Sequence, residues 1–144
     1  MNYFVTGGTG FIGRFLLQRL VLREDAKIHL LVRESSQEKF DELVERLGEQ
    51  GDKLIPVYGD ITAPGVIDAA VLKSLKGKID HVFHLAAVYD MEMDDATAGR
   101  FNIDGTRNLV EMVNALAGSS KASKPRLHHM SSVAVAGGDY VGTF

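Results

Sequence analysis

The chain has 144 residues, of which 45% are hydrophobic and 24% are charged, so it is long enough to bury the core of one domain. Its formal charge of −3 does not provide the positive field that nucleic-acid binding needs. It contains no cysteine, which excludes disulfides, thiolate metal sites and cysteine nucleophiles. The sequence shows neither a signal peptide nor the ~20 consecutive apolar residues of a membrane span, and we therefore expect a cytoplasmic protein.

Five short apolar runs have the length of buried β-strands and are bounded by glycine, aspartate or polar loops. They cover residues 3–6, 27–32, 53–58, 80–85 and 126–131.

Segments with helical periodicity separate these runs. In the first segment we expect one buried face, formed by Ile12, Phe15, Leu16 and Leu20. The second helix is expected to begin at Ser35 with a capping box to Glu38 and to end near Gly48. A short third helix is expected at about 68–75, and a long fourth helix at about 95–116.

A glycine-rich turn joins the first expected strand to the first expected helix. Residues 6–13 read Thr-Gly-Gly-Thr-Gly-Phe-Ile-Gly and contain the pattern G-x-G-x-x-G. Such glycines allow a tight turn, a close approach of the backbone to a pyrophosphate, and close packing of helix against strand. The free amides and the positive dipole end of the following helix attract phosphates. Because the motif lies between a strand and a helix, it predicts dinucleotide binding rather than an ordinary turn.

The alternation of strand and helix predicts the fold. Four strand–helix units followed by a fifth strand indicate an α/β, Rossmann-like doubly wound parallel sheet of order 3-2-1-4-5. We expect residues 1–132 to form this domain, with the sheet incomplete at its C-terminal end, and residues 133–144 to be a glycine-rich tail or loop.

Arg33 indicates which dinucleotide is bound. It stands 20 positions after Gly13, at the end of the second expected strand, where an NAD site keeps an acidic residue for the ribose 2′-hydroxyl. A guanidinium at that point suits a 2′-phosphate, and the hydroxyls of Ser35 and Ser36 can add donors. Glu34 is the competing candidate, since an acidic residue would indicate NAD. However, Glu34 lies one residue beyond the expected position, and its side chain points to the other face of the sheet if the strand continues. We therefore predict NADP(H) as the cofactor.

Further motifs, in the same order along the chain, resemble those of the extended short-chain dehydrogenase/reductases. Besides the glycine turn they are Gly59-Asp60-Ile61, His84-Leu85-Ala86-Ala87, Asn102-Ile103-Asp104-Gly105-Thr106 and Ser131-Ser132. Within this group, residues 31–34 (LVRE) and 73–91 look most like the bacterial fatty acyl-CoA reductases, which reduce long-chain acyl-CoA with NADPH. Nucleotide-sugar epimerases and dehydratases share the glycine turn and HLAA but usually have an acidic residue where Arg33 stands.

The resemblance implies a role for each motif. Asp60 would accept a hydrogen bond from the adenine amino group, and Ile61 would cover the ring. Ser132 would be the catalytic residue, donating to a substrate carbonyl oxygen, and Asn102 would tie backbone or water near the site. The cofactor-binding set is Thr6, Gly7, Gly10, Phe11, Ile12, Gly13, Arg33, Asp60, Ile61, Leu85, Ala86 and Ala87.

The reductive chemistry of this family also needs a tyrosine followed four residues later by a lysine. Tyr3, Tyr58, Tyr89 and Tyr140 are followed at that distance by Gly7, Thr62, Met93 and Phe144. We therefore expect the N-terminal section of a larger NADPH-dependent reductase, acting on a small molecule such as acyl-CoA and able to pair as a homodimer through the fourth helix. An epimerase- or dehydratase-type enzyme and a non-enzymatic NADP-binding module remain as alternatives.

The histidines do not predict a metal site. His81 and His84 lie three positions apart in one expected strand, so they point to opposite faces, and the adjacent His128 and His129 do the same. No pair has the i, i+2 spacing that places two ligands on one face of a strand, and we expect these side chains to be structural.

Overall fold

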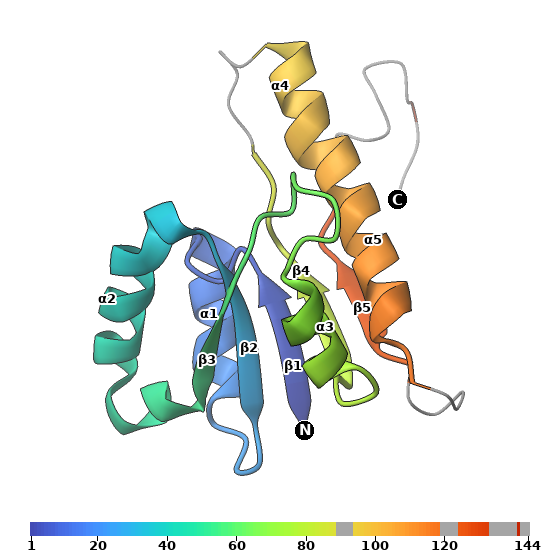
Figure 1. Cartoon of the computed structure of the whole chain (residues 1–144). Helices are drawn as coiled ribbons and strands as arrows, with labels where there is room; N and C mark the ends of the chain where they lie inside the picture. Colours follow the sequence, from blue (N-terminus) through green and yellow to red (C-terminus); the bar gives the residue numbers. More distant parts are fainter. Residues whose placement is uncertain (89–93, 119–123, 133–140, 142–144) are drawn as a thin grey trace.

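The computed structural model describes residues 1–88, 94–118, 124–132 and 141. These residues form a five-stranded parallel sheet of order β3-β2-β1-β4-β5 with helices on both faces (Figure 1). The predicted fold class and strand order are confirmed. The predicted tail, residues 133–144, lies outside the described residues except for Val141. Within the part of the chain that is described, no helix is long and apolar enough to cross a membrane.

The five strands pair in parallel register around the central strand β1. The strands are β1 (Asn2–Thr6), β2 (Lys27–Val32), β3 (Leu54–Tyr58), β4 (His81–His84) and β5 (Arg126–His129). In this register Tyr3 lies beside both Ile28 and His81. Because all the strands run parallel, their carboxyl ends meet at one edge of the sheet, where such folds bind ligands.

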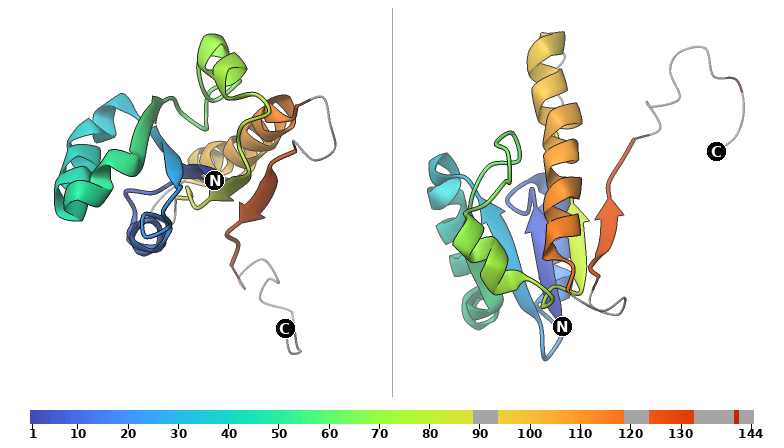
Figure 2. Two further views of the ribbon diagram at one scale, coloured as in Figure 1. Left: turned by 90° about the horizontal axis from the view of Figure 1, so that it is seen from below. Right: turned by 45° about the vertical axis from the view of Figure 1, so that its right-hand side comes forward.

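Two pairs of helices cover the two faces of the sheet (Figure 2). Helices α1 (Phe11–Leu20) and α2 (Gln37–Leu47) cover one face, and α3 (Ala69–Leu75) and α5 (Gly105–Leu116) cover the other. The alternation of side chains along β1 builds a core on each face, because Tyr3 and Val5 pack with α1 and α2 while Phe4 packs with α3 and α5. Each fully buried side chain of this size contributes about 1.5–3 kcal/mol to folding.

The buried face of α1 differs from the prediction. Ile12 and Phe15 are 51% and 57% exposed, whereas Gly13, Leu17 and Leu20 are buried. A Cβ on Gly13 would come within 2.3 Å of the Gly7 carbonyl oxygen, so the missing side chain lets α1 pack directly onto the glycine turn. The stripe of Gly13, Leu17 and Leu20 therefore faces the sheet. Of the predicted face, Leu20 is confirmed as buried and Leu16 packs partly buried against the same core, whereas Ile12 and Phe15 are wrong.

The start of α2 also differs from the prediction. A 3-10 turn, Glu34–Ser36, precedes the helix, and α2 begins at Gln37 with Ser36 as N-cap and no side-chain capping bond. The predicted start at Ser35 and the capping box between Ser35 and Glu38 are therefore wrong. The chain enters the helix through the 3-10 turn, in which the Ser36 amide donates to the Arg33 carbonyl oxygen at 2.8 Å. The predicted end is confirmed, since the helix stops at Leu47 and Gly48 has a φ of 57°.

The long fourth helix is present but is not uniform. It consists of α4 (Asp95–Gly99), a π-helical segment (Arg100–Asp104) and α5. Helical periodicity predicts the full length of this rod, but it contains no signal for the π-helical segment in the middle.

Candidate dinucleotide-binding site

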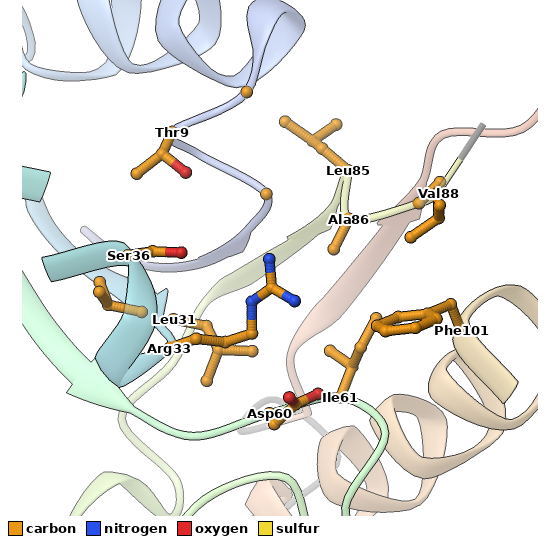
Figure 3. Close-up of a pocket in the computed structure, with 14 residues that line it drawn as sticks. Thr9, Leu31, Arg33, Ser36, Asp60, Ile61, Leu85, Ala86, Val88 and Phe101 are labelled. Atoms are coloured by element: carbon orange, nitrogen blue, oxygen red, sulfur yellow. The ribbon is translucent and has the colours of Figure 1, made fainter. Parts of the chain in front are cut away.

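A pocket lies at the carboxyl edge of the sheet, between the glycine turn, the ends of the strands and the fourth helix (Figure 3). Its volume is about 210 Å³, below the ~300–1,000 Å³ of most ligand pockets, so a dinucleotide would extend beyond it. The structure brings together in this pocket most of the predicted cofactor-binding residues, namely Gly7, Gly10, Arg33, Asp60, Ile61, Leu85, Ala86 and Ala87.

The glycine turn is in close contact with the loop that follows β4. Gly7 has a φ of +70°, and a Cβ there would lie 2.6 Å from the Ala86 amide nitrogen. Gly7 therefore makes the tight turn, and Gly13 provides the close packing of α1 described above. Gly10 is the N-cap of α1, and its amide donates to the Gly7 carbonyl at 3.1 Å. These positions leave the N-terminal end of α1 beside the pocket, as phosphate binding requires.

A hydrogen-bond network behind the pocket lining supports the contact between the glycine turn and the loop after β4. Thr6, predicted to bind the cofactor, is fully buried and lies outside the pocket lining. Its Oγ1 accepts from the Ala86 amide at 3.2 Å and lies 2.8 Å from His84 Nδ1. His84 Nε2 in turn lies 3.1 Å from Thr106 Oγ1 on α5. Burial, assisted by the nearby His129, lowers the pKa of His84 to about 4, so the imidazole is neutral at physiological pH.

Arg33 follows the end of β2, and its guanidinium points into the middle of the pocket (Figure 3). Ser36 and Thr9 lie to one side of it, and Asp60, Ile61 and Phe101 to the other. Ser36 lines the pocket, whereas the competing residue Glu34 does not. The cation at the end of β2 is thus available to a ligand in the pocket.

Asp60 and Ile61 form the side of the pocket beyond β3. One carboxylate oxygen of Asp60, Oδ1, accepts from the Thr62 amide at 2.8 Å and from the Thr62 hydroxyl at 2.9 Å. Ile61 is 7% exposed, and its carbonyl accepts from Asn108 Nδ2 of α5 at 2.9 Å. Val66, whose carbonyl accepts from the Asp60 amide, has a φ of 64°, which is strained for a β-branched residue. Such strain is often found at ligand sites.

The π-helical segment places two neighbouring residues at the site. Phe101 lines the pocket opposite Arg33. Asn102 holds Val88 at both backbone groups, accepting from its amide at 2.9 Å and donating to its carbonyl at 2.8 Å. Asn102 therefore fixes the loop that carries Leu85, Ala86 and Ala87, in the way that the resemblance implied.

Sequence reasoning did not assign the remaining lining residues, which are Thr9, Leu31, Val32, Val88 and Phe101. Thr9 lies inside the glycine motif, so its position next to the phosphate-binding amides is a signal that could have identified it. Phe101 has the spacing of an ordinary apolar residue of a helix, and the periodicity hides its contact with the pocket.

Some predicted residues lie outside this pocket. Phe11 is 71% exposed, and its ring contacts Phe15 edge-on. Ser132 is exposed and lies beyond the end of β5. Its catalytic role stays a prediction. Among the described residues no group of three potential metal ligands occurs.

The sequence and the fold are similar to those of known reductases. Residues 5–144 match the family of NAD-binding domains described as "Male sterility protein". The chain is 32% identical, over 90% of its length, to a linear gramicidin synthase of Brevibacillus parabrevis, and 31% identical, over 80% of its length, to "Putative fatty acyl-CoA reductase CG8303" of Drosophila melanogaster. The terminal R domain from the myxalamid PKS-NRPS pathway superposes with a TM-score of 0.77 at 29% identity and covers 93% of this chain.

These relatives are longer than this chain. The chain spans 3% of the gramicidin synthase polypeptide, 24% of the Drosophila protein and 35% of the R-domain structure.

Proposed function

Because the chain belongs to the NAD-binding family described as "Male sterility protein", we propose that it is the NADPH-binding section of a reductase that acts on a thioester. Membership in this family confirms the predicted resemblance to the extended short-chain dehydrogenase/reductases and the predicted cofactor, NADP(H). The chain is thus an NAD(P)-binding reductase domain. The observation that supports a preference for NADPH over NADH is the Arg33 guanidinium pointing into the pocket.

The preference can be tested by titrating NADPH and NADH into the wild type and Arg33→Ala. We expect Arg33→Ala to weaken NADPH binding by about 1.5–3 kcal/mol, the value of a charge-assisted hydrogen bond, and to leave NADH binding unchanged. Arg23→Ala, a change at an exposed arginine away from the pocket, is the matched control. Equal affinity of the wild type for both cofactors would contradict the assignment of Arg33.

We infer that the substrate is a thioester of a long-chain acyl group, with acyl-CoA as the first candidate. The similarity to an insect protein named as a fatty acyl-CoA reductase supports this class. A second candidate, a thioester held on a carrier protein, is favoured by the similarity to the gramicidin synthase and to the R domain of a PKS-NRPS pathway. Both reactions transfer hydride from NADPH to a thioester carbonyl, and they differ in the group that carries the acyl chain.

Hydride transfer from NADPH to the thioester carbonyl leaves a hemithioacetal anion. The step takes up one proton, and the carbon–sulfur bond then breaks to release an aldehyde and the free thiol. A positioned acid contributes about 10²–10⁴-fold to such a proton transfer. The tyrosine–lysine pair that the resemblance implies is absent from these 144 residues, so we infer that the chain works as part of a longer reductase. Oxidation of NADPH by the longer protein, with acyl-CoA and with a carrier-bound acyl thioester, separates the two candidates. Ser132→Ala should slow turnover strongly and leave NADPH affinity nearly unchanged.

If neither thioester is reduced, the substrate assignment is wrong, and a nucleotide sugar becomes the substrate to test.

A further inference from the structure

The side chain of Asp60 is held through one of its two carboxylate oxygens. Asp60 is half-buried and lines the pocket, where its carboxylate lies beside Ile61 and across from the Arg33 guanidinium (Figure 3). The amide and the hydroxyl of Thr62 both donate to Oδ1, at 2.8 and 2.9 Å. For the other oxygen, Oδ2, the described part of the chain provides neither a hydrogen-bond donor nor an ion-pair partner. Thr62 is not among the residues that line the pocket, so Oδ1 is turned toward the loop and Oδ2 is left for a ligand.

A second aspartate–threonine pair in the chain is arranged differently. Asp94 is the N-cap of α4, and it accepts from the Thr97 amide through Oδ1 at 2.8 Å and from the Thr97 hydroxyl through Oδ2 at 2.7 Å. Each oxygen of that carboxylate therefore has a donor within the protein. At Asp60 the same two kinds of donor meet on one oxygen. Because a carboxylate oxygen has two lone pairs, the two donors saturate Oδ1 and leave Oδ2 with its full capacity to accept.

The backbone of the same loop is fixed as well. The Asp60 amide donates to the Val66 carbonyl at 2.9 Å, and a Cβ on Gly59 would collide with that carbonyl oxygen. Val66 adopts a φ of 64° while its side chain is buried in the core that also contains Ile61. A β-branched residue keeps such a strained conformation only where the surrounding structure enforces it. Both the backbone and the side chain of Asp60 are therefore held in place before a ligand binds.

A fixed acceptor distinguishes purine bases by the group at position 6 of the ring. Adenine carries an amino group there, which donates to a carboxylate oxygen, whereas hypoxanthine carries a carbonyl oxygen, which a carboxylate repels. Hypoxanthine also has a ring N–H beside this carbonyl, and a carboxylate that is free to turn can accept from that group instead. A carboxylate whose Oδ1 is held by Thr62 cannot turn in this way without breaking both bonds, so it disfavours the base that carries the carbonyl.

We propose that Thr62 is a positioning residue that makes the cofactor site selective for a purine with an amino group. It does so through Asp60, by binding Oδ1 and leaving Oδ2 as the fixed acceptor at the side of the pocket. The proposal rests on the proposed function, since it assumes that the adenine of NADP(H) lies at Asp60. It adds a residue outside the pocket lining to those that determine which nucleotide is bound.

The test compares ligands that differ only in the base: NADPH with its hypoxanthine analogue, and AMP with IMP. The wild type should bind the adenine forms about 10- to 100-fold more tightly, which is the range of a hydrogen bond to a charged group. Thr62→Val, which keeps the shape but loses the hydroxyl, should lower this preference about 3- to 10-fold, mainly by tightening the binding of the hypoxanthine forms. Thr62→Ser, which keeps the hydroxyl, should retain the wild-type preference. Thr97→Val removes the same kind of bond outside the pocket and should retain it too.

Asp60→Asn provides a test that a loss of folding cannot imitate. The two donors of Thr62 should hold the carbonyl oxygen of the new amide in the place of Oδ1, so that its NH2 group faces the ligand and donates. This variant should bind the hypoxanthine forms about 3- to 10-fold more tightly than the adenine forms.

Three results would overturn the inference: equal binding of both bases by the wild type, an unchanged preference in Thr62→Val, or a remaining preference for adenine in Asp60→Asn. If the wild type binds neither NADPH nor NADH, the proposed function itself fails, which is a different result.

Discussion

The two helical glycines Gly13 and Gly99 differ in the space around them, and only Gly13 needs to lack a side chain for its helix to pack. A Cβ on Gly13 would overlap the backbone of Gly7 and Gly8 at 2.3–2.8 Å, whereas a Cβ on Gly99 would meet nothing within 4 Å. We expect Gly13→Ala to destabilise the protein by about 2–3 kcal/mol, because rigid backbone atoms must move. Gly99→Ala should stabilise it by about 0.5–1 kcal/mol, because alanine loses less entropy in a helix. Urea unfolding of both variants measures the difference, and equal effects would contradict this explanation.

At the scale of single residues, the sequence was informative wherever a short motif defines the chemistry. The glycines and Arg33 could be placed at the site because their spacing from the first strand determines where they lie. Phe101 and Val88 could not, because each contacts the pocket only after a helix and a loop have been packed across the sheet. Thr6 was predicted to contact the cofactor, but in the structure it positions the Ala86 amide from beneath the pocket.

At the scale of elements, the π-helical segment is what brings Asn102 to the loop after β4. Asn102→Ala removes both hydrogen bonds to Val88, and we expect a loss of about 1–2 kcal/mol because these bonds are partly exposed to solvent. The Val88 amide should exchange its hydrogen faster. Asn114→Ala, on the exposed side of the same helix, should leave this exchange rate unchanged. Hydrogen exchange followed by mass spectrometry or NMR measures both effects, and unchanged exchange in Asn102→Ala would show that the loop is held by other contacts.

The order and length of the helices and strands were predicted better than the rotation of α1 about its axis and the residue at which α2 begins. Apolar periodicity gave the extent of the helices, because it depends only on neighbours in sequence. The orientation of α1 depends on how closely Gly13 approaches the turn, and the start of α2 depends on the bond from Ser36 to Arg33. Both are set by backbone packing, which periodicity does not contain.

At the scale of the whole molecule, three histidines make folding stability depend on pH. Burial is the main cause that lowers the pKa of His29, His81 and His84. In the unfolded chain these groups take up protons near pH 6.5, while His84 in the folded protein does so only at about 4. The unfolded state therefore binds more protons between these values, and stability must fall as the pH falls through this window.

For His84 alone, this loss is on the order of 3 kcal/mol between pH 6.5 and 4. We expect the free energy of unfolding to be lower at pH 5 than at pH 7, and the difference to be smaller in His84→Gln, which keeps polar atoms near Thr6 and Thr106. Urea titrations at the two pH values measure it. The same pH dependence in the variant and in the wild type would exclude His84 as the main source.

The strand order followed from the sequence because alternating strands and helices with right-handed connections allow few arrangements. The side-chain contacts between strands and helices could not be predicted from the sequence. The bonds of His84 to Thr6 and Thr106 join β1, β4 and α5, and no local pattern reports which helix will lie over which strand.

The contact between the glycine turn and the loop after β4 also has a consequence for the order of events in folding. The bond from the Ala86 amide to Thr6 joins residues 80 apart in the chain, so a chain that has paired only β1, β2 and β3 has the turn but lacks the opposite side of the pocket. Such an intermediate has Gly10, Arg33 and Asp60 but lacks the side of the pocket formed by Leu85, Ala86 and Ala87, so it should bind a dinucleotide more weakly than the complete fold. Because a ligand stabilises each state in proportion to how tightly that state binds it, the cofactor should slow unfolding more than it speeds folding. NADP(H) would then stabilise the finished fold more than the route by which the chain reaches it.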